Sequence, residues 1–245
     1  MKLSFVIPAY NEEESLGPCL EAIISDCKYF QNQVEIIVVN NASTDRTAEV
    51  ARRYGNVKVV TEMRKGLLFA RQAGFEASTG DLIANIDADT IMPSGWVRKV
   101  FDQFAMNKKM VALSGPYIYY DLSLWINAWV WIFYVVGYVN HLIAQYVFRV
   151  GAMMQGGNFI LRRSALETVG GYNLALSFYG EDTDMAIRMQ RIGRVKFSFF
   201  LPMRTSGRRL KDEGVIKMGL KYGANYIWPI LFGRAYSSDY KDIRK

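Results

Sequence analysis

Residues 66–93 read GLLFARQAGFEASTGDLIANIDADTIMP, and this stretch decides the fold. Its first part, residues 66–78, has the apolar spacing of a helix, and residues 81–86 form a short apolar run typical of a buried strand. Two carboxylates, Asp87 and Asp89, directly follow the predicted strand. Side chains two residues apart would share one face of a strand, where their negative charges would repel each other. The acids therefore need a partner.

The segments on either side continue the same alternation of strand and helix. Apolar runs predict strands at 3–8, 34–39 and 57–60. Helical spacing of apolar residues predicts helices at 12–28 and 43–55. The first helix begins late, near Pro18, and the second has a Ser or Thr cap. This pattern predicts an α/β fold with a doubly wound, mostly parallel sheet and helices on both faces. Ligands of such sheets bind at the carboxyl ends of the strands.

The acid pair after the strand at 81–86 offers only oxygen ligands, which suit a hard cation such as Mg²⁺ or Mn²⁺. The chain has one histidine and two cysteines, so a zinc site built from soft ligands is excluded. Alternatively, loop aspartates cap the next helix, but Ser94 is a better cap there and leaves both acids free. The pattern favours a metal site, with capping as the alternative.

Composition and charge limit the protein class. The chain has 245 residues, of which 51% are hydrophobic and 22% charged, as in globular proteins. Cys19 and Cys27 lie about 12 Å apart along a predicted helix, too far for a disulfide. Two free thiols without a signal peptide indicate a reducing cytosol. Residues 203–245 hold ten Lys/Arg and four Asp/Glu, which favours an anionic partner over a merely solvated segment.

Two further segments follow strands at the same predicted edge. PAYNEEE (8–14) follows the first strand and NNASTD (40–45) the second, and polar side chains there can hold a nucleotide base and ribose. The chain has neither the glycine fingerprint of dinucleotide-binding folds nor a Walker loop. A metal on the Asp-x-Asp pair would then hold the phosphates.

Together these motifs resemble family-2 glycosyltransferases with the GT-A nucleotide-sugar-binding fold, over residues 1–210. The resemblance rests on several linked motifs in the family's order, namely IPAYNEE, VVNNASTDRT, GLLFARQAGFEASTGDLIANIDADT, GGNFILRRSALETVGGY and GEDTDMAIRMQRIGRV. It implies a GT-A domain at 1–210, followed by a basic, aromatic extension at 211–245.

The resemblance also implies which residues bind the donor. The implied contacts run from the nucleotide to the metal and are Pro8, Ala9, Tyr10, Glu12, Arg71, Asp87, Ala88 and Asp89. Asp87 would meet the ribose or sugar, and Asp89 would coordinate Mg²⁺ or Mn²⁺ on the diphosphate. Where the family commonly has an acid pair, this chain has Asn40 and Asn41. Asn41 could still accept from a base N–H, and family habit favours UDP over GDP.

A second acid pair, Glu181 and Asp182, opens a predicted helix, whose dipole alone would explain the charges. By resemblance Asp182 is the base that takes the acceptor's proton, which gives inversion of configuration. The Gln-x-x-Arg-Trp signature of processive synthases is missing, which implies a single transfer. The remaining expected contacts with acceptor or phosphate are Gly156, Gly157, Asn158, Glu181, Arg208 and Arg209. A simple turn and a surface charge run are the alternatives for the glycine and arginine segments.

Residues 122–148 contain no formal charge. A single membrane crossing there would separate Asp89 from Asp182, although both must reach one sugar. A polar-aromatic stripe at positions 123, 127, 131, 134, 138, 141 and 145 instead suits a helix in the membrane interface, with Trp and Tyr at headgroup depth. The alternative is a helix packed within the protein or a dimer.

The sequence therefore predicts an inverting, metal-dependent glycosyltransferase that moves one sugar from a nucleoside-diphosphate donor to a hydroxyl or phosphate acceptor. We expect a lipid-linked acceptor and a peripheral location on the cytosolic face of the cell membrane, with no nucleic acid as partner. A sugar nucleotidyltransferase is one alternative, although it would need a basic, glycine-rich loop where PAYNEEE stands. A non-catalytic sugar-nucleotide-binding protein is the other, suggested by Asn40 and Asn41.

Overall fold

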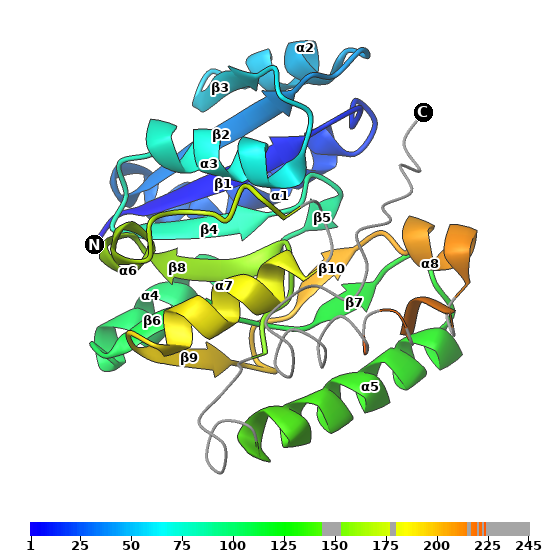
Figure 1. Ribbon diagram of the computed structural model, residues 1–245. Coiled ribbons are helices and arrows are strands. Elements are labelled where there is room, and N and C mark those ends of the chain that lie inside the picture. The colour runs from blue at the N-terminus through cyan, green and yellow to red at the C-terminus, as the bar shows by residue number, and fades with distance from the viewer. Residues whose placement is uncertain (144–152, 177–179, 215–216, 220, 222, 224–245) are drawn as a thin grey trace.

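The computed structural model describes residues 1–143, 153–176, 180–214, 217–219, 221 and 223 (Figure 1). A central sheet carries the strand order β3-β2-β1-β4-β8-β6-β9. Its strands are β1 (Leu3–Ala9), β2 (Val34–Asn41), β3 (Val57–Glu62), β4 (Leu82–Ile86), β6 (Met110–Ser114), β8 (Asn158–Arg162) and β9 (Arg194–Phe197). Only β8 runs antiparallel to its neighbours, β4 and β6. The expected mostly parallel α/β sheet is confirmed.

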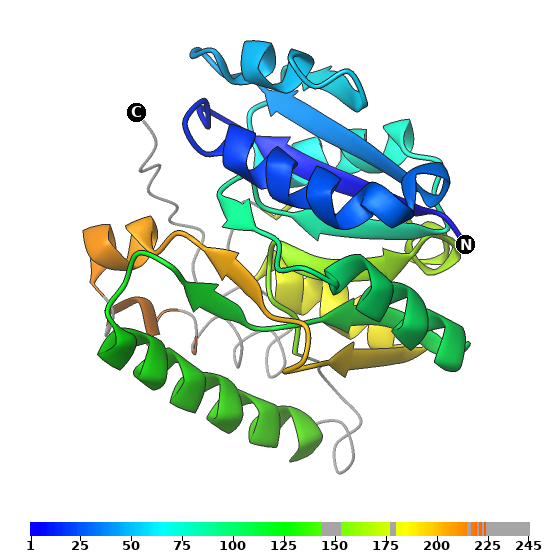
Figure 2. The ribbon, with the colours of Figure 1, turned by 180° about the vertical axis from the view of Figure 1, so that it is seen from behind.

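Helices cover both faces of this sheet (Figures 1 and 2). One face packs against α1 (Leu16–Asp26), α2 (Thr47–Arg52) and α4 (Trp96–Met106). The other packs against α3 (Leu67–Ala77), α6 (Arg163–Thr168) and α7 (Glu181–Gln190). β1, β2 and β4 are nearly continuous apolar runs because both of their faces are largely buried, whereas the edge strand β3 is mostly half-buried. Short 3₁₀ turns at Cys27–Tyr29 and Gln31–Gln33 lead from α1 to β2.

A second, three-stranded sheet lies where the chain leaves β4. It contains β5 (Thr90–Ile91), β10 (Met203–Thr205) and β7 (Tyr117–Tyr119), with β10 in the middle. The short helix α8 (Arg208–Glu213) follows β10. This sheet brings residues near 205 next to the acid pair after β4, a contact that sequence spacing does not show. The expected division of the chain at residue 210 falls inside α8, and most of the extension lies outside the described residues.

The helix starts differ from the predicted caps. Ser94 does not cap α4; the carboxylate of Asp26 accepts the amides of Gly95 at 2.5 Å and Val97 at 2.8 Å. At α2, the amide of Thr47 donates to Asp45 at 2.9 Å, so neither Ser43 nor Thr44 is the cap. In α4 the cap comes from a residue about seventy positions away, because Gly95 and the end of α1 meet only in the folded chain.

The apolar stretch forms α5 (Leu124–Ile143), beside β7; residues 144–148 of the predicted helix lie outside the described part. Within the described part of the polar stripe, Asn127, Tyr134 and His141 face the protein, which corrects the expected headgroup placement. The Asn127 amide bonds both backbone groups of Tyr119 at 2.9 Å, and the Tyr134 hydroxyl accepts the amide of Tyr117 at 3.1 Å. Buried polar groups need partners, and the backbone around β7 supplies them.

The outward face of α5 is apolar. Its side chains are between 48% and 88% exposed and include Leu124, Trp125, Trp129, Ile132, Phe133, Val135, Val136 and Val139. Among the described residues, no helix has the length and apolarity needed to cross a membrane. α5 is therefore amphipathic, but it turns its polar side chains toward the protein and leaves its apolar side chains exposed, the opposite of a surface helix in water.

Candidate active site

The loops after β1 and β2 lie side by side at the carboxyl edge of the sheet, as expected. Asn11 and Ala42 have positive backbone φ angles of 49° and 56°, which are unusual for residues other than glycine and are often found at functional sites. The Asn11 amide donates to Ser43 Oγ at 3.2 Å, and the Thr44 amide donates to Asn11 Oδ1 at 2.9 Å. These bonds hold the two turns together beside the acid pair.

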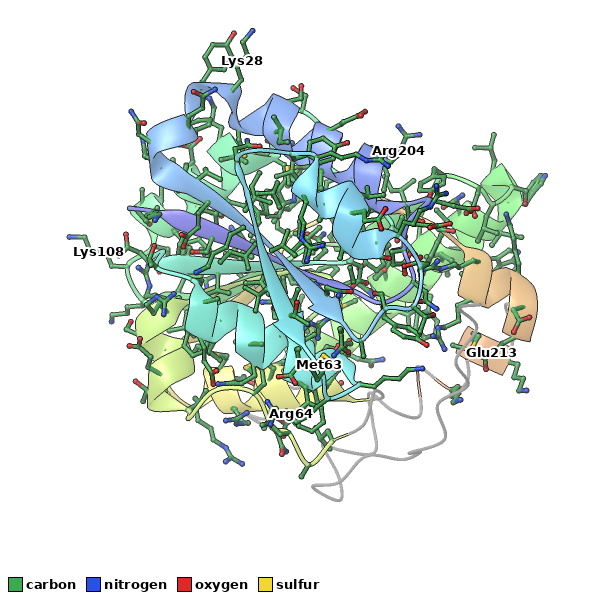
Figure 3. The ribbon with its side chains drawn as sticks, turned by 90° about the horizontal axis from the view of Figure 1, so that it is seen from above. Lys28, Met63, Arg64, Lys108, Arg204 and Glu213 are labelled. Carbon is green, nitrogen blue, oxygen red and sulfur yellow. The ribbon has the colours of Figure 1, made fainter. Side chains whose placement is uncertain are left out.

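The nucleotide end of the expected site contains Pro8 and Ala9, which are buried at the end of β1. The ring of the next residue, Tyr10, lies 3.9 Å from the Lys65 ammonium, a cation–π contact that the sequence did not suggest. Lys65 follows Met63 and Arg64 in the loop after β3 (Figure 3). A cationic loop therefore faces the expected nucleotide segment.

Asn41 serves the structure of this loop. Its side-chain amide donates to the carbonyls of Glu62 and Arg64 at 3.1 and 2.7 Å, and its Oδ1 accepts the amide of Gly66 at 2.8 Å. The residue is 4% exposed. Both amide protons are used, so a contact with a base depends on the second lone pair of Oδ1 alone.

Asp87 receives a donor from each side. The Tyr117 hydroxyl lies 2.9 Å from Asp87 Oδ2, and Arg71 Nη2 lies 3.8 Å from Asp87 Oδ1. Burial, with Asp87 and Asp89 nearby, raises the pKa of Tyr117 well above its usual value, so its hydroxyl keeps its proton. Tyr117 was missed by sequence reasoning because a lone tyrosine after a Gly-Pro pair carries no signal of its own.

Arg71 links the two acid pairs. It reaches from α3, is 1% exposed, and places Nη1 at 2.6 Å from Glu181 Oε2. Burial raises the pKa of Glu181 to about 7, although Arg71 opposes the shift. The pKa of Arg71 itself moves upward because Glu181 and Asp87 outweigh its burial, so it remains a cation. The guanidinium therefore fixes the relative positions of the first turn of α7 and the end of β4.

Asp182 is partly exposed, next to Glu181. Its Oδ1 accepts the amide of Thr183 at 2.8 Å, and its Oδ2 accepts the amide of Gly156 at 3.3 Å. Burial raises the pKa of Asp182, while these backbone donors restrain the rise. The carboxylate is held in place and retains lone pairs for a proton.

The glycine loop touches both acid pairs, which favours its role in the site over a simple turn. A Cβ on Gly156 would lie 2.8 Å from Glu181 Oε1, and one on Gly157 would lie 2.1 Å from Asp87 Oδ2. Gly157 also has a positive φ of 79°. Asn158 is a correction to the expected ligand contacts: it is fully buried and donates to the carbonyls of Gly115 and Leu201, both at 3.0 Å.

Arg208 joins a further acid, Glu12, to Asp89. Its Nη2 pairs with Glu12 Oε1 and lies 3.1 Å from Asp89 Oδ2, while Thr205 Oγ1 lies 3.4 Å from Asp89 Oδ1. Arg209 instead pairs with Glu213 at 3.2 Å within α8. Of the two neighbouring arginines, Arg208 thus pairs with Glu12 and Asp89, whereas Arg209 pairs with Glu213.

The donor set is consistent with a divalent cation that completes its coordination from a ligand. Among the described residues, no group of three or more His, Cys, Asp and Glu side chains forms a protein-only metal cage. Mg²⁺ is commonly held by one or two carboxylates together with substrate phosphates and water. Asp89 offers one such carboxylate at the edge where ligands of this fold bind. It follows Asp87 and the buried Ala88 in the chain.

Comparison with known proteins gives the family. Residues 4–170 match the model of Glycosyl transferase family 2. The probable glycosyltransferase YdaM of Bacillus subtilis is 30% identical over 213 residues, which are 78% of this chain and 47% of that protein. An undecaprenyl-phosphate 4-deoxy-4-formamido-L-arabinose transferase of Proteus mirabilis is 37% identical over 98 residues, 38% of this chain and 30% of that protein.

The fold has solved counterparts as well. The mannosyltransferase PcManGT of Pyrobaculum calidifontis, solved with GDP-Man and Mn²⁺, superposes with a TM-score of 0.69 at 19% identity, over 92% of this chain and 61% of that one. This chain spans less than half the length of the two curated relatives. The family match covers more than half of the chain, in the segments that supply the first acid pair and the glycine loop. The chain belongs to glycosyltransferase family 2.

Proposed function

We propose that the protein is an inverting, metal-dependent glycosyltransferase that moves one sugar from a nucleoside-diphosphate donor to a hydroxyl or phosphate of a lipid-linked acceptor. The observation that carries the proposal is the juxtaposition of Asp87 with the Glu181–Asp182 pair, which Arg71 and the loop at Gly156 and Gly157 hold together. Asp89 follows two residues after Asp87 and pairs with Arg208. An acid pair for the donor and a separate base are what a single displacement at an anomeric carbon requires.

Donor binding is assigned to the edge formed by the loops after β1, β2 and β4. Tyr10 and the segment around it would hold the nucleoside, with UDP tested before GDP. Asp87, oriented by Tyr117 and Arg71, would hold the ribose or sugar. Asp89 would hold Mg²⁺ or Mn²⁺, which balances the charge of the departing diphosphate.

Transfer is assigned to Asp182. As the acceptor oxygen attacks, its proton must leave, and a carboxylate is suited to a transition state in which the sugar resembles an oxocarbenium ion. The amides of Gly156 and Thr183 orient the carboxylate, and Glu181 holds Arg71 against the donor side. One displacement with one base inverts the anomeric configuration. A phosphate acceptor that is already ionised would need less help from the base.

A lipid-linked acceptor is supported by α5. Its outward face is apolar and exposed, while its inward Tyr134 bonds Gln155 at 2.7 Å, next to the glycine loop. An exposed apolar surface of this kind is typical of interfacial helices. The relative from Proteus mirabilis is named for transfer to undecaprenyl phosphate. We therefore place the enzyme peripherally on the cytosolic face of a membrane, with α5 in the lipid interface.

The test is transfer itself. Purified protein, vesicles containing a polyprenyl phosphate, Mn²⁺ and a panel of labelled UDP- and GDP-sugars should yield a labelled lipid and free nucleoside diphosphate. Retention of the donor's configuration in the product would contradict the single displacement. Formation of a nucleotide sugar from a nucleoside triphosphate would support the nucleotidyltransferase alternative. Donor binding without any turnover would indicate a non-catalytic protein.

A further inference from the structure

One guanidinium from the C-terminal part of the chain serves two acids from its N-terminal half. Arg208, which follows the sheet strand β10, pairs through Nη2 with Glu12 and with Asp89 Oδ2 at 3.1 Å. The side chains of Glu12 and Asp89 are 3% and 13% exposed, whereas that of Arg208 is 35% exposed. The cation is therefore the member of the cluster that solvent and solutes can most easily approach.

The backbone at Arg208 is anchored independently of these acids. Asp121 accepts the Gly207 amide at 2.6 Å and the Ser206 hydroxyl at 2.9 Å. A Cβ on Gly207 would lie 2.5 Å from a side-chain carbon of Leu122, so the chain is also tightly packed here. A change of side-chain rotamer can thus move the guanidinium without moving α8.

The Arg208 guanidinium would compete with a metal ion for the Asp89 carboxylate. A divalent cation on Asp89 would lie beside the Arg208 guanidinium, and like charges at such a distance repel each other. A diphosphate changes the balance, because it offers anionic oxygens to the metal and also to the arginine, which binds phosphate well. Without the diphosphate, Asp89 therefore cannot bind the metal ion and the Arg208 guanidinium equally well at the same time.

We propose that Arg208 is a built-in counter-ion, which holds Glu12 and Asp89 in the free protein and turns to the diphosphate when donor and metal bind. This inference rests on the proposed function, because it assumes a metal and a nucleoside diphosphate at Asp89. It adds a consequence that the proposed function does not contain: Arg208 keeps the free protein from binding metal alone and couples metal binding to the nucleotide.

The experiment measures Mn²⁺ binding to the full chain without donor, from the free Mn²⁺ signal in electron paramagnetic resonance. Wild type should bind Mn²⁺ weakly, and Arg208→Gln should bind it at least about tenfold more tightly, because a positive charge next to the ion is removed. Arg204→Gln is the matched control, since Arg204 is exposed on β10 and projects outward (Figure 3). It removes the same charge four residues away and should leave Mn²⁺ affinity unchanged.

Titrations with UDP complete the comparison. In wild type, saturating UDP should strengthen Mn²⁺ binding strongly, and Mn²⁺ should strengthen UDP binding by the same factor. In Arg208→Gln this factor should fall, because the free protein no longer resists the metal and the arginine–phosphate contact is lost. A coupling factor equal to that of wild type would overturn the inference.

Loss of Arg208 leaves Glu12 buried without this guanidinium, which can destabilise the fold. The same comparison can be made without the Glu12 charge, between the single variant Glu12→Gln and the double variant Glu12→Gln/Arg208→Gln. The double variant should bind Mn²⁺ more tightly than the single variant. An Mn²⁺ affinity that Arg208→Gln leaves unchanged or lowers, in either background, would overturn the role of Arg208. Wild type that binds no Mn²⁺ even with UDP or GDP would instead contradict the metal in the proposed function.

Discussion

At the scale of single residues, Glu181 and Asp182 are adjacent acids with different surroundings. Glu181 is 7% exposed and directly paired with Arg71 at 2.6 Å. Asp182 is more exposed and is bonded by backbone amides of Gly156 and Thr183. A base must be accessible to the acceptor and must offer an oxygen to the proton, so these surroundings favour Asp182 as the proposed base. We propose that Glu181 instead positions Arg71.

Replacement of Asp182 tests this assignment. Asp182→Asn keeps the shape and cannot accept the proton, so kcat should fall by about 10²–10⁴ while nucleoside diphosphate affinity stays nearly unchanged. Asp184→Asn is the matched control, because Asp184 pairs with Arg188 at 3.5 Å on the same helix. Steady-state kinetics and calorimetry provide the two readouts. If Glu181→Gln were the variant with lost kcat and Asp182→Asn were active, the roles within the pair would be reversed.

Glu181 should also leave a signature in stability. Burial raises the pKa of its carboxyl from 4.5 to about 7, so between these values the folded protein binds a proton that the unfolded chain has lost. The stabilisation that comes from protonated Glu181 in the folded protein is therefore fully present below pH 4.5 and is lost as the pH rises to about 7.

The measurement is urea unfolding of wild type and Glu181→Gln from pH 4.5 to 8. The variant carries a neutral group at every pH, so its free energy of unfolding should rise relative to wild type between pH 4.5 and 7 and then level off. A constant difference over this range would show that Glu181 does not titrate there.

At the scale of elements, α5 shows why an apolar sequence does not settle its own environment. The stripe that contains Asn127, Tyr134 and His141 has the polar atoms, and from its periodicity we expect it at the headgroup level of a membrane interface. In the folded chain these atoms bond backbone groups around β7 and at Met153. Trp131 and Tyr138 pack against Phe199, with ring centroids 5.5 and 5.2 Å apart. The apolar face is left exposed.

Membrane binding should depend on that outer face. Trp125, Trp129 and Phe133 are 80%, 67% and 48% exposed, so replacing all three with Ser should release the protein from anionic vesicles without unfolding it. Vesicle flotation and circular dichroism are the measurements. High salt should weaken wild-type binding only in part, because it screens the basic residues of 203–245 and leaves apolar burial intact.

The inner face provides the control for this prediction. Trp131→Ser removes a ring that packs on Phe199, so it should lower the free energy of unfolding and leave vesicle binding of the folded fraction unchanged. A triple outer variant that unfolds, or a wild type that never floats, would favour α5 as a helix packed in a protein interface.

The start of α4 gives a second prediction at this scale. Asp26 accepts two amides at that helix start, so Asp26→Ala should lower the free energy of unfolding by about 1 kcal/mol, as the loss of a helix cap commonly does. Chemical denaturation would measure the change. Asp102→Ala, at an exposed position within α4, should have a much smaller effect. Equal effects would mean that the distant cap contributes nothing.

At the scale of the whole molecule, the site gathers residues from both ends and the middle of the chain. Glu12, Asp89, Glu181 and Arg208 come from four separate segments and belong to two arginine-centred clusters, and Asp182 is bonded beside them by the Gly156 amide. The β5-β10-β7 sheet makes this possible because β10 pairs with β5 directly after Asp89. The acid pair therefore receives charges from distant sequence.

Removal of the metal ligand should separate donor binding from folding. Asp89→Ala should abolish transfer and most of the Mn²⁺-dependent part of donor binding, because the diphosphate loses its bridge to the protein. Calorimetry with UDP and GDP, with and without Mn²⁺, measures this part, and excess chelator should produce the same loss in wild type. Full activity in chelator would contradict a metal-dependent reaction.

The sequence by itself determined the first four strands, most of the helices and the carboxyl edge at which the candidate site forms, because local apolar periodicity and turn residues specify them. The linked motifs also gave the family, which the comparison confirms. Asp87 and Asp89 could be named from their place after a strand, whereas Glu181 and Asp182 entered the site through the family resemblance.

Only the tertiary structure decided which of these groups share a partner. Tyr117 on Asp87, Arg208 on Asp89 and Asp26 on α4 join residues that are tens to more than a hundred positions apart. Burial and charge pairing depend on neighbours in space, so no local pattern reports them. For the same reason, the tertiary structure decided which face of α5 is inside, because its polar atoms follow the available backbone partners.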